Sequence, residues 1–270
     1  MSSIIVLAAV AAAAILAPML SPADPLRNDL LERLTPPMWS AGGSAAHPLG
    51  TDTLGRDVLS RLLYGARISL LVGLTTVLIS GVFGVALGVL GGFYGGWLDD
   101  VFMRAGDVQL AFPVLLPGVA LLSVLGPGLG NLILVLALSG WITYARIVRG
   151  ETLSLKHREF VEAARALGAL DGRLIWRHVL PNVWAPIAVV ATFSVARTII
   201  AEASLSFLGL GVPAPSPSWG AMLDEGRNYI TTGWWLALFP GTAILLVVLV
   251  INLVGDWLRD ALDPRVERGI

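Results

Sequence analysis

Long apolar segments alternate with short polar ones along most of the chain. Six segments approach or reach the length of about 17–25 residues that crosses a bilayer as a helix. They cover residues 4–20, 68–92, 101–125, 129–148, 184–208 and 234–257. This pattern predicts an all-α membrane protein with six transmembrane helices, and an even number of crossings places both termini on one side.

The first apolar segment allows two interpretations. It is short and alanine-rich, as signal peptides are, but no Lys or Arg precedes it, so the usual positively charged region is missing. We therefore assign residues 1–20 to a retained first transmembrane helix. Both interpretations place the next segment outside the cytoplasm.

Residues 21–67 are predicted to form an extracytoplasmic loop and an interfacial helix. The loop is rich in proline, glycine and charge, and Asp57 can cap a helix that starts at Val58 and leads into the membrane. Asp52, Arg56 and Asp57 could form a ligand site, but we favour an exposed turn with local salt bridges and caps. Residues 209–232 are expected to form a second external loop.

Several residues inside the apolar segments suggest how the helices pack. Gly84 and Gly88 have the spacing that lets two helices approach backbone to backbone. Pro113 and Pro117 predict that the third transmembrane helix is kinked or interrupted.

Two ionisable residues, Arg197 and Glu202, lie in the fifth apolar segment. Charges at membrane depth are costly unless they are paired or hydrated. The two residues are five apart, which is unfavourable for a bridge along one helix, so we expect contacts to other helices. They could line a translocation path, but a structural polar role is favoured.

The polar stretch 156–181 lies between the fourth and fifth apolar segments. Residues 156–167 have the composition of an amphipathic helix of about three turns, and one face carries Phe160, Ala163, Ala164 and Leu167. Small residues beside the carboxylate of Glu162 leave room for another surface to approach.

The end of this stretch predicts an elbow of two short helices. Gly168 stands where a left-handed C-cap residue belongs, and Asp171 could cap a second helix that Pro181 stops. Lys and Arg are more frequent in the internal segments when the elbow is cytoplasmic, which the positive-inside rule favours. Both termini would then be cytoplasmic, with a permease core at 68–256 and a cytoplasmic tail at 257–270.

Composition supports membrane insertion and excludes several other classes. The 270 residues are 56% hydrophobic and 14% charged, with a mean hydropathy of +0.78, too apolar for a soluble chain. There is no cysteine, so disulfides, thiol nucleophiles and cysteine metal sites are excluded. The net charge of −1 gives no basis for nucleic-acid binding.

No motif for ATP hydrolysis or other catalysis occurs. The chain lacks G-x-x-x-x-G-K-[ST], H-E-x-x-H and G-x-S-x-G, so we predict no catalytic residue, no metal site and no ATPase activity of its own. Active transport would need energy from a partner.

Five stretches resemble a known family. Glu162-Ala-Ala, followed by Gly168 and Leu180-Pro181, resembles the EAA loop of permease subunits of binding-protein-dependent ABC importers, with His178 where that family has isoleucine. Residues 47–57, 61–67, 201–211 and 260–265 resemble the dipeptide/oligopeptide permease subfamily, in particular its C-type subunit, which is also similar to nickel permeases. The likeness covers nearly the whole chain.

The resemblance implies the type I ABC importer permease fold and transport by alternating access in the bacterial cytoplasmic (inner) membrane. The expected partners are two ABC ATPase subunits, which use ATP and Mg, a second homologous permease subunit, an extracytoplasmic substrate-binding protein and membrane lipid. No cofactor would be bound by this chain. ATPase coupling is assigned by the resemblance to Glu162, Ala163, Ala164, Gly168, Leu180 and Pro181.

Two alternatives to a dipeptide or oligopeptide permease stay open. The same class of transporter could carry nickel or another small solute. A non-transporting membrane scaffold could instead use the elbow to recruit a cytoplasmic protein. The proline-broken third segment and the ionisable fifth segment favour a translocation path over a scaffold.

Overall fold

A computed structural model of the chain describes residues 2–113 and 115–262. The family-like motif at 260–265 and the predicted tail at 257–270 therefore lie largely outside the described residues. Within these residues the structure consists of helices and turns, with one isolated β-bridge between Thr51 and Asp57.

Four helices in the described part of the chain are long and apolar enough to cross a membrane. They are α3 (Val58–Tyr94), α6 (Leu129–Leu155), the continuous helical stretch Asp171–Phe207 and α11 (Trp235–Leu262). A fifth span results if α4 (Gly96–Leu110) and α5 (Leu115–Leu125) count as one broken helix. The predicted first span is instead split into α1 (Ser2–Ile15) and α2 (Ala17–Leu20), each shorter than a full crossing.

Helix α3 is unbroken over 37 residues, so the predicted interfacial helix is simply its first turns. The Asp57 carboxylate accepts the Ser60 N–H at 2.7 Å, which confirms the predicted N-cap. No proline follows that could end the helix before the apolar stretch begins.

The packing of α3 on α6 confirms the role of its closely spaced glycines. A Cβ at Gly84 would lie 2.3 Å from the Trp141 carbonyl oxygen, and one at Gly88 would lie 2.6 Å from that of Ala145. Only glycine allows the two backbones to approach this closely.

The third predicted span is interrupted, as its prolines indicated. The axes of α4 and α5 make an angle of 90°, with Pro113 in the break and Pro117 in the first turn of α5. Helix α4 is held to α6 by the ion pair of Asp99 with Arg149, whose Nε lies 2.5 Å from the carboxylate.

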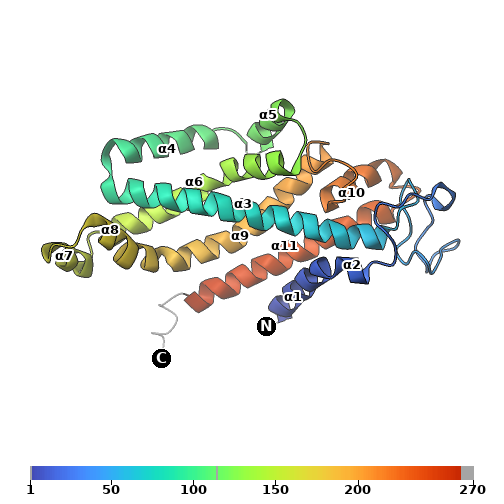
Figure 1. Cartoon of the computed structure of the whole chain (residues 1–270), viewed down its shortest axis with the longest axis horizontal. Helices are drawn as coiled ribbons and strands as arrows, with labels where there is room; N and C mark the ends of the chain where they lie inside the picture. The colour runs from blue at the N-terminus through green and yellow to red at the C-terminus, as the bar shows by residue number, and fades with distance from the viewer. Residues whose placement is uncertain (1, 114, 263–270) are drawn as a thin grey trace.

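The functional segments lie at opposite ends of the molecule. In Figure 1, α7 (Glu159–Ala166) and α8 (Asp171–Leu174) are at one end of the long axis, and α10 (Trp219–Gly226) is near the other. The loop of residues 21–57, including η1 (Leu30–Glu32), is also at that second end, and α3, α6 and α9 (Leu180–Phe207) run between the ends. The second predicted loop contains α10 and η3 (Arg227–Tyr229), so it is more ordered than expected.

Candidate functional site

The elbow is fixed to the ends of three long helices by a small apolar core. Val161 of α7 and Leu174 of α8 are fully buried and pack in one cluster with Phe93 of α3 and Val148 of α6. The Arg165 guanidinium lies 5.8 Å from the centroid of the Phe93 ring, and Lys156 Nζ donates to the Gly92 carbonyl at 3.1 Å. The elbow is therefore a packed extension of the helix bundle.

Gly168 ends α7 as the sequence predicted. Its φ of +85° is left-handed, its N–H donates to the Arg165 carbonyl at 2.9 Å, and the next N–H, of Ala169, donates to the Ala164 carbonyl at 3.1 Å. These two bonds form a Schellman motif, which turns the chain sharply after the helix.

The face of α7 that packs on the helix bundle is not the apolar face described from the sequence. The helix has eight residues rather than about three turns, and Val161 and Ala164 face the core. Phe160, Ala163 and Leu167 are exposed, with Leu167 at 90%. The prediction assumed an isolated helix, whereas the neighbouring ends of α3 and α6 select another side.

The second arm of the elbow also differs from the prediction. Asp171 is the first residue of α8 and makes no cap hydrogen bond, and α8 continues through the π-helix η2 (Ile175–Val179) into α9. Pro181 lies where η2 passes into α9, inside the continuous helical stretch Asp171–Phe207, so it does not stop the helix.

The structure brings the predicted coupling residues to the elbow in two groups. Glu162, Ala163 and Gly168 are exposed on α7 and its turn. Ala164 and Leu180 pack into the same apolar cluster, which joins α7 to the start of α9. Pro181 is exposed beside that cluster and lines an apolar groove between α3 and α9.

Apolar side chains extend the exposed surface of the elbow. Leu167, Leu170 and Trp176 are 90%, 81% and 76% exposed. Glu162 makes no ion pair with any residue that the structure describes. The elbow therefore presents exposed apolar side chains beside the Glu162 carboxylate and the exposed charges of Glu159, Arg165 and Asp171, a chemistry suited to docking another protein.

The two ionisable residues of α9 have different surroundings. Glu202 is fully buried and accepts hydrogen bonds from Ser69 of α3 at 3.2 Å and from Ser206 at 2.8 Å. The predicted contact to another helix is thus present for Glu202. Arg197 is exposed and makes no ion pair within the described residues.

A buried ion network near the start of α3 was not expected from the sequence. Arg56 Nε lies 2.6 Å from the Asp52 carboxylate, and Arg61 contacts both Asp52 and Glu225 of α10. Asp52 is only 2% exposed, so the predicted exposed turn is wrong, although the local salt bridge and the cap are right. The group of charges at residues 52–61 of so apolar a chain was a signal that could have indicated the network. Its partner Glu225 could not be found in this way, because it is 164 residues from Arg61.

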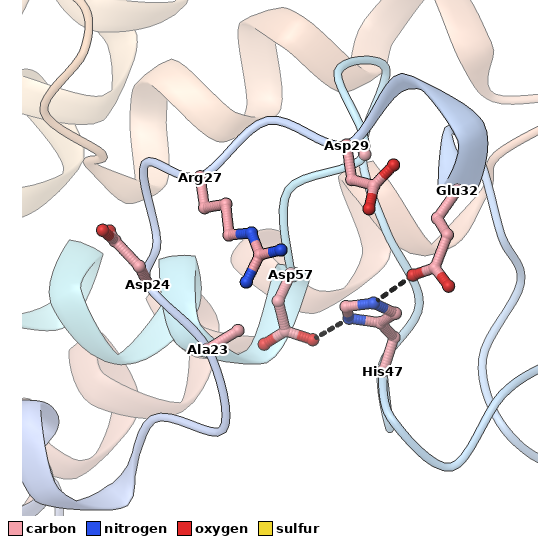
Figure 2. Close-up of a pocket in the computed structure, with 8 residues that line it drawn as sticks. Ala23, Asp24, Arg27, Asp29, Glu32, His47 and Asp57 are labelled. Carbon is pink, nitrogen blue, oxygen red and sulfur yellow. Dashed lines mark hydrogen bonds and ion pairs between the residues drawn. The ribbon is translucent and has the colours of Figure 1, made fainter.

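His47 lines a polar pocket of about 200 Å³ beside this network. Figure 2 shows His47 between Asp57 and Glu32, whose carboxylates lie 2.9 Å from Nδ1 and 2.6 Å from Nε2. Burial alone would lower the pKa of His47, but the hydrogen bonds and charges of Asp57 and Glu32 raise it above its usual value. Among the described residues, no group of His, Asp and Glu is arranged to hold a metal ion.

Together, the long apolar helices and the exposed elbow describe a multi-pass membrane protein with exposed apolar side chains at one end. Residues 84–268 match the family of binding-protein-dependent transport system inner membrane components. The chain belongs to this family.

Proteins similar over almost the whole chain are permeases. A di/tripeptide transport system permease of Pseudomonas aeruginosa is 47% identical over 254 residues, which cover 94% of this chain and 84% of the relative. A dipeptide transport system permease of Bacillus subtilis is 44% identical over 94% of this chain and 78% of the relative. A glutathione transport system permease of Pectobacterium atrosepticum is 46% identical over 84% of this chain and 75% of the relative.

A solved structure supports the fold. A chain of the MetNI methionine ABC transporter in an inward-facing conformation superposes with a TM-score of 0.61. The match covers 76% of this chain and 97% of that chain at 19% identity, so it establishes that the two chains share a fold.

Proposed function

We propose that this chain is the permease subunit of an ABC importer that carries dipeptides or short oligopeptides across the inner membrane. The observation that carries the proposal is the near full-length similarity, at 42–47% identity, to permeases named for dipeptide or di/tripeptide transport. The glutathione permease of similar identity favours a tripeptide as the second candidate substrate.

The elbow is proposed as the docking site of the separate ATPase subunits, which would bind the ATP and Mg. Exposed apolar side chains such as Leu167 and Trp176 are costly in water and favour a partner that covers them. In this proposal Glu162 and Ala163 lie in the contact, and Gly168 shapes it. Ala164, Leu180 and Pro181 connect the contact to α9.

The opposite end of the molecule is proposed to face the extracytoplasmic binding protein. Residues 21–57 and α10 lie there, far from the elbow along the long axis (Figure 1). The elbow and both termini would be cytoplasmic, in agreement with the distribution of Lys and Arg along the chain.

An apolar groove supports a second, homologous permease subunit as a further partner. The groove has a volume of about 960 Å³ and is lined by α3 and α9, including Leu78 and Trp184. A helix of the second permease would cover this surface, and the translocation path would then form between the two subunits.

Uptake into vesicles tests the proposed substrate class. The chain is reconstituted with its partner permease, ATPases and binding protein, and ATP-dependent uptake of a labelled dipeptide is compared with that of glutathione and Ni²⁺. We expect dipeptide uptake to dominate. Uptake of Ni²⁺ alone would reassign the substrate, and uptake of no solute together with no bound ATPase would favour the scaffold hypothesis.

Charge reversal at the elbow tests the docking site. We expect Glu162→Arg to release the ATPases during co-purification, because a reversed charge in a docked contact opposes the complementary charge of its partner. Glu151→Arg is the matched control, since Glu151 is also exposed but lies on α6 before the elbow. Equal retention by the two variants would remove Glu162 from the docking surface.

A further inference from the structure

Glu202 is a fully buried carboxylate that the proposed docking does not use. It lies on α9, the helix that starts at the elbow, about 33 Å further along at 1.5 Å per residue. No Lys, Arg or His pairs with it among the residues that the structure describes. Such a group is retained in an apolar bundle only when its hydrogen bonds are satisfied.

Serine hydroxyls satisfy this carboxylate and connect it to a second and a third helix. Ser69 of α3 donates to Glu202 Oε2 at 3.2 Å, and Ser206 donates to Oε1 at 2.8 Å. The Ser69 hydroxyl also accepts the backbone N–H of Trp219, the first residue of α10, at 3.4 Å. Ser69 therefore relays one connection from α9 through α3 to α10.

The three helices are packed without space around these bonds. A Cβ at Gly220 of α10 would lie 2.6 Å from the Ala203 Cα of α9. A Cβ at Gly65 of α3 would lie 3.1 Å from the Trp219 ring, whose Nε1 donates to the Leu62 carbonyl at 3.0 Å. Contacts this close make the junction move as one body.

Helix α10 is also held further along its length. Glu225 pairs with Arg56 at 3.0 Å and with Arg61 at 2.5 Å, which attaches α10 to the external loop and the first turns of α3. A displacement of α9 at Glu202 would therefore act on the external segments through α10. Figure 1 shows α9 running from α8 to the neighbourhood of α10.

We propose that Glu202 is a positioning residue that couples the elbow to the external end of this permease through Ser69 and Trp219. Helix α9 carries the displacement of the elbow, and the Glu202 junction passes it to α10. This inference rests on the proposed function, because it assumes that ATPases move the elbow.

Two variants interrupt the junction at different atoms. Glu202→Gln replaces the carboxylate, which accepts hydrogen bonds from two hydroxyl groups, by an amide with one acceptor oxygen and one donor NH2 group. Ser69→Ala removes the relay and leaves the carboxylate in place. Ser204→Ala is the control, because the Ser204 hydroxyl donates only to the Ile200 carbonyl of its own helix. We expect both junction variants to keep the ATPases bound but to lower solute uptake per ATP hydrolysed about tenfold, with the control unchanged.

A site-specific label follows the motion directly. The chain has no cysteine, so Asn228→Cys, at an exposed position just after α10, provides a single thiol for labelling. We expect its labelling rate to change on addition of ATP and vanadate with Glu202 and Ser69 intact, and to stay constant in each junction variant.

The outcomes separate this inference from the proposed function. If the unaltered complex takes up no solute, the proposed function fails. If the unaltered complex transports, three results overturn the inference alone: normal coupling in the junction variants, no ATP-dependent change at the label in the unaltered junction, or loss of assembly in both variants, which would make the junction purely structural.

Discussion

Gly168 has a backbone conformation that a side chain resists. Its φ of +85° places it in the left-handed region, which costs an L-residue roughly 1–2 kcal/mol. The turn of the elbow depends on this residue, because the hydrogen bonds of the Schellman motif form only with that φ.

We therefore expect Gly168→Ala to loosen the end of α7 by about 1 kcal/mol, so that the Ala169 amide exchanges its hydrogen about fivefold faster. Gly172→Ala is the control, because Gly172 has no positive φ and no atom would contact its added Cβ. Hydrogen exchange followed by mass spectrometry makes the comparison. Unchanged protection in Gly168→Ala would contradict this account of the turn.

His47 gives the stability of its pocket a dependence on pH. Its pKa is raised in the folded protein, so its contribution to stability is present below its unfolded pKa and is lost as the pH rises through the folded value. We expect His47→Gln to lower the melting temperature more at about pH 5.5 than at about pH 8.5. Thermal unfolding in detergent at both pH values measures this, and an equal loss at both would refute it.

Helix α3 and helix α6 form the closest pair of long elements, and their contact depends on the absence of side chains. A methyl group at Gly84 would collide with the Trp141 carbonyl, so the helices would have to separate. Small residues of this kind are what allows membrane helices to gain contacts between their backbones.

Replacing that glycine should weaken the bundle. We expect Gly84→Ala to cost about 2 kcal/mol, whereas Gly150→Ala on α6 should be neutral or slightly stabilising because nothing lies near its Cβ. The melting temperatures of the purified variants give the test. A loss of the same size in both would show that the contact with Trp141 does not matter.

The elements were predictable where a signal is local. Hydrophobicity located most of the long helices, Asp57 and Gly168 marked a start and an end, and Pro113 marked a break, since each signal acts on the adjacent stretch of chain. The packed face of α7 could not be read from the sequence because it depends on where α3 and α6 end. Pro181 was misread because a proline usually breaks a helix, whereas here η2 continues into α9.

The end of the molecule opposite the elbow is a single unit because charges from distant parts of the chain meet there. Asp52 and Arg61 belong to residues 21–67 and Glu225 to residues 209–232, and the three form one network. No local pattern predicts which of these charges will be paired, so both the burial of Asp52 and the role of Glu225 emerged only from the structure.

Neutralising one member should therefore destabilise the whole end of the molecule opposite the elbow. We expect Asp52→Asn to cost about 3 kcal/mol, because it leaves Arg56 and Arg61 buried without a full partner. Asp224→Asn is the control, since its pair with Arg227 is partly exposed and should contribute less than about 1 kcal/mol. Unfolding by denaturant compares the two variants, and similar midpoints would show that the network contributes little.

Helix α3 is longer than the hydrocarbon layer of a membrane is thick. Its 37 residues extend about 55 Å, whereas the hydrocarbon layer measures about 30 Å. Even with a tilt, several turns must stand in the water or the headgroups, and the charged side chains Arg61 and Arg67 lie at one of these projecting ends. The segments before α3 are thus held above the lipid, within reach of a soluble protein. Dissolved salt screens their exposed charges, whereas the buried pair of Asp52 and Arg61 is screened much less.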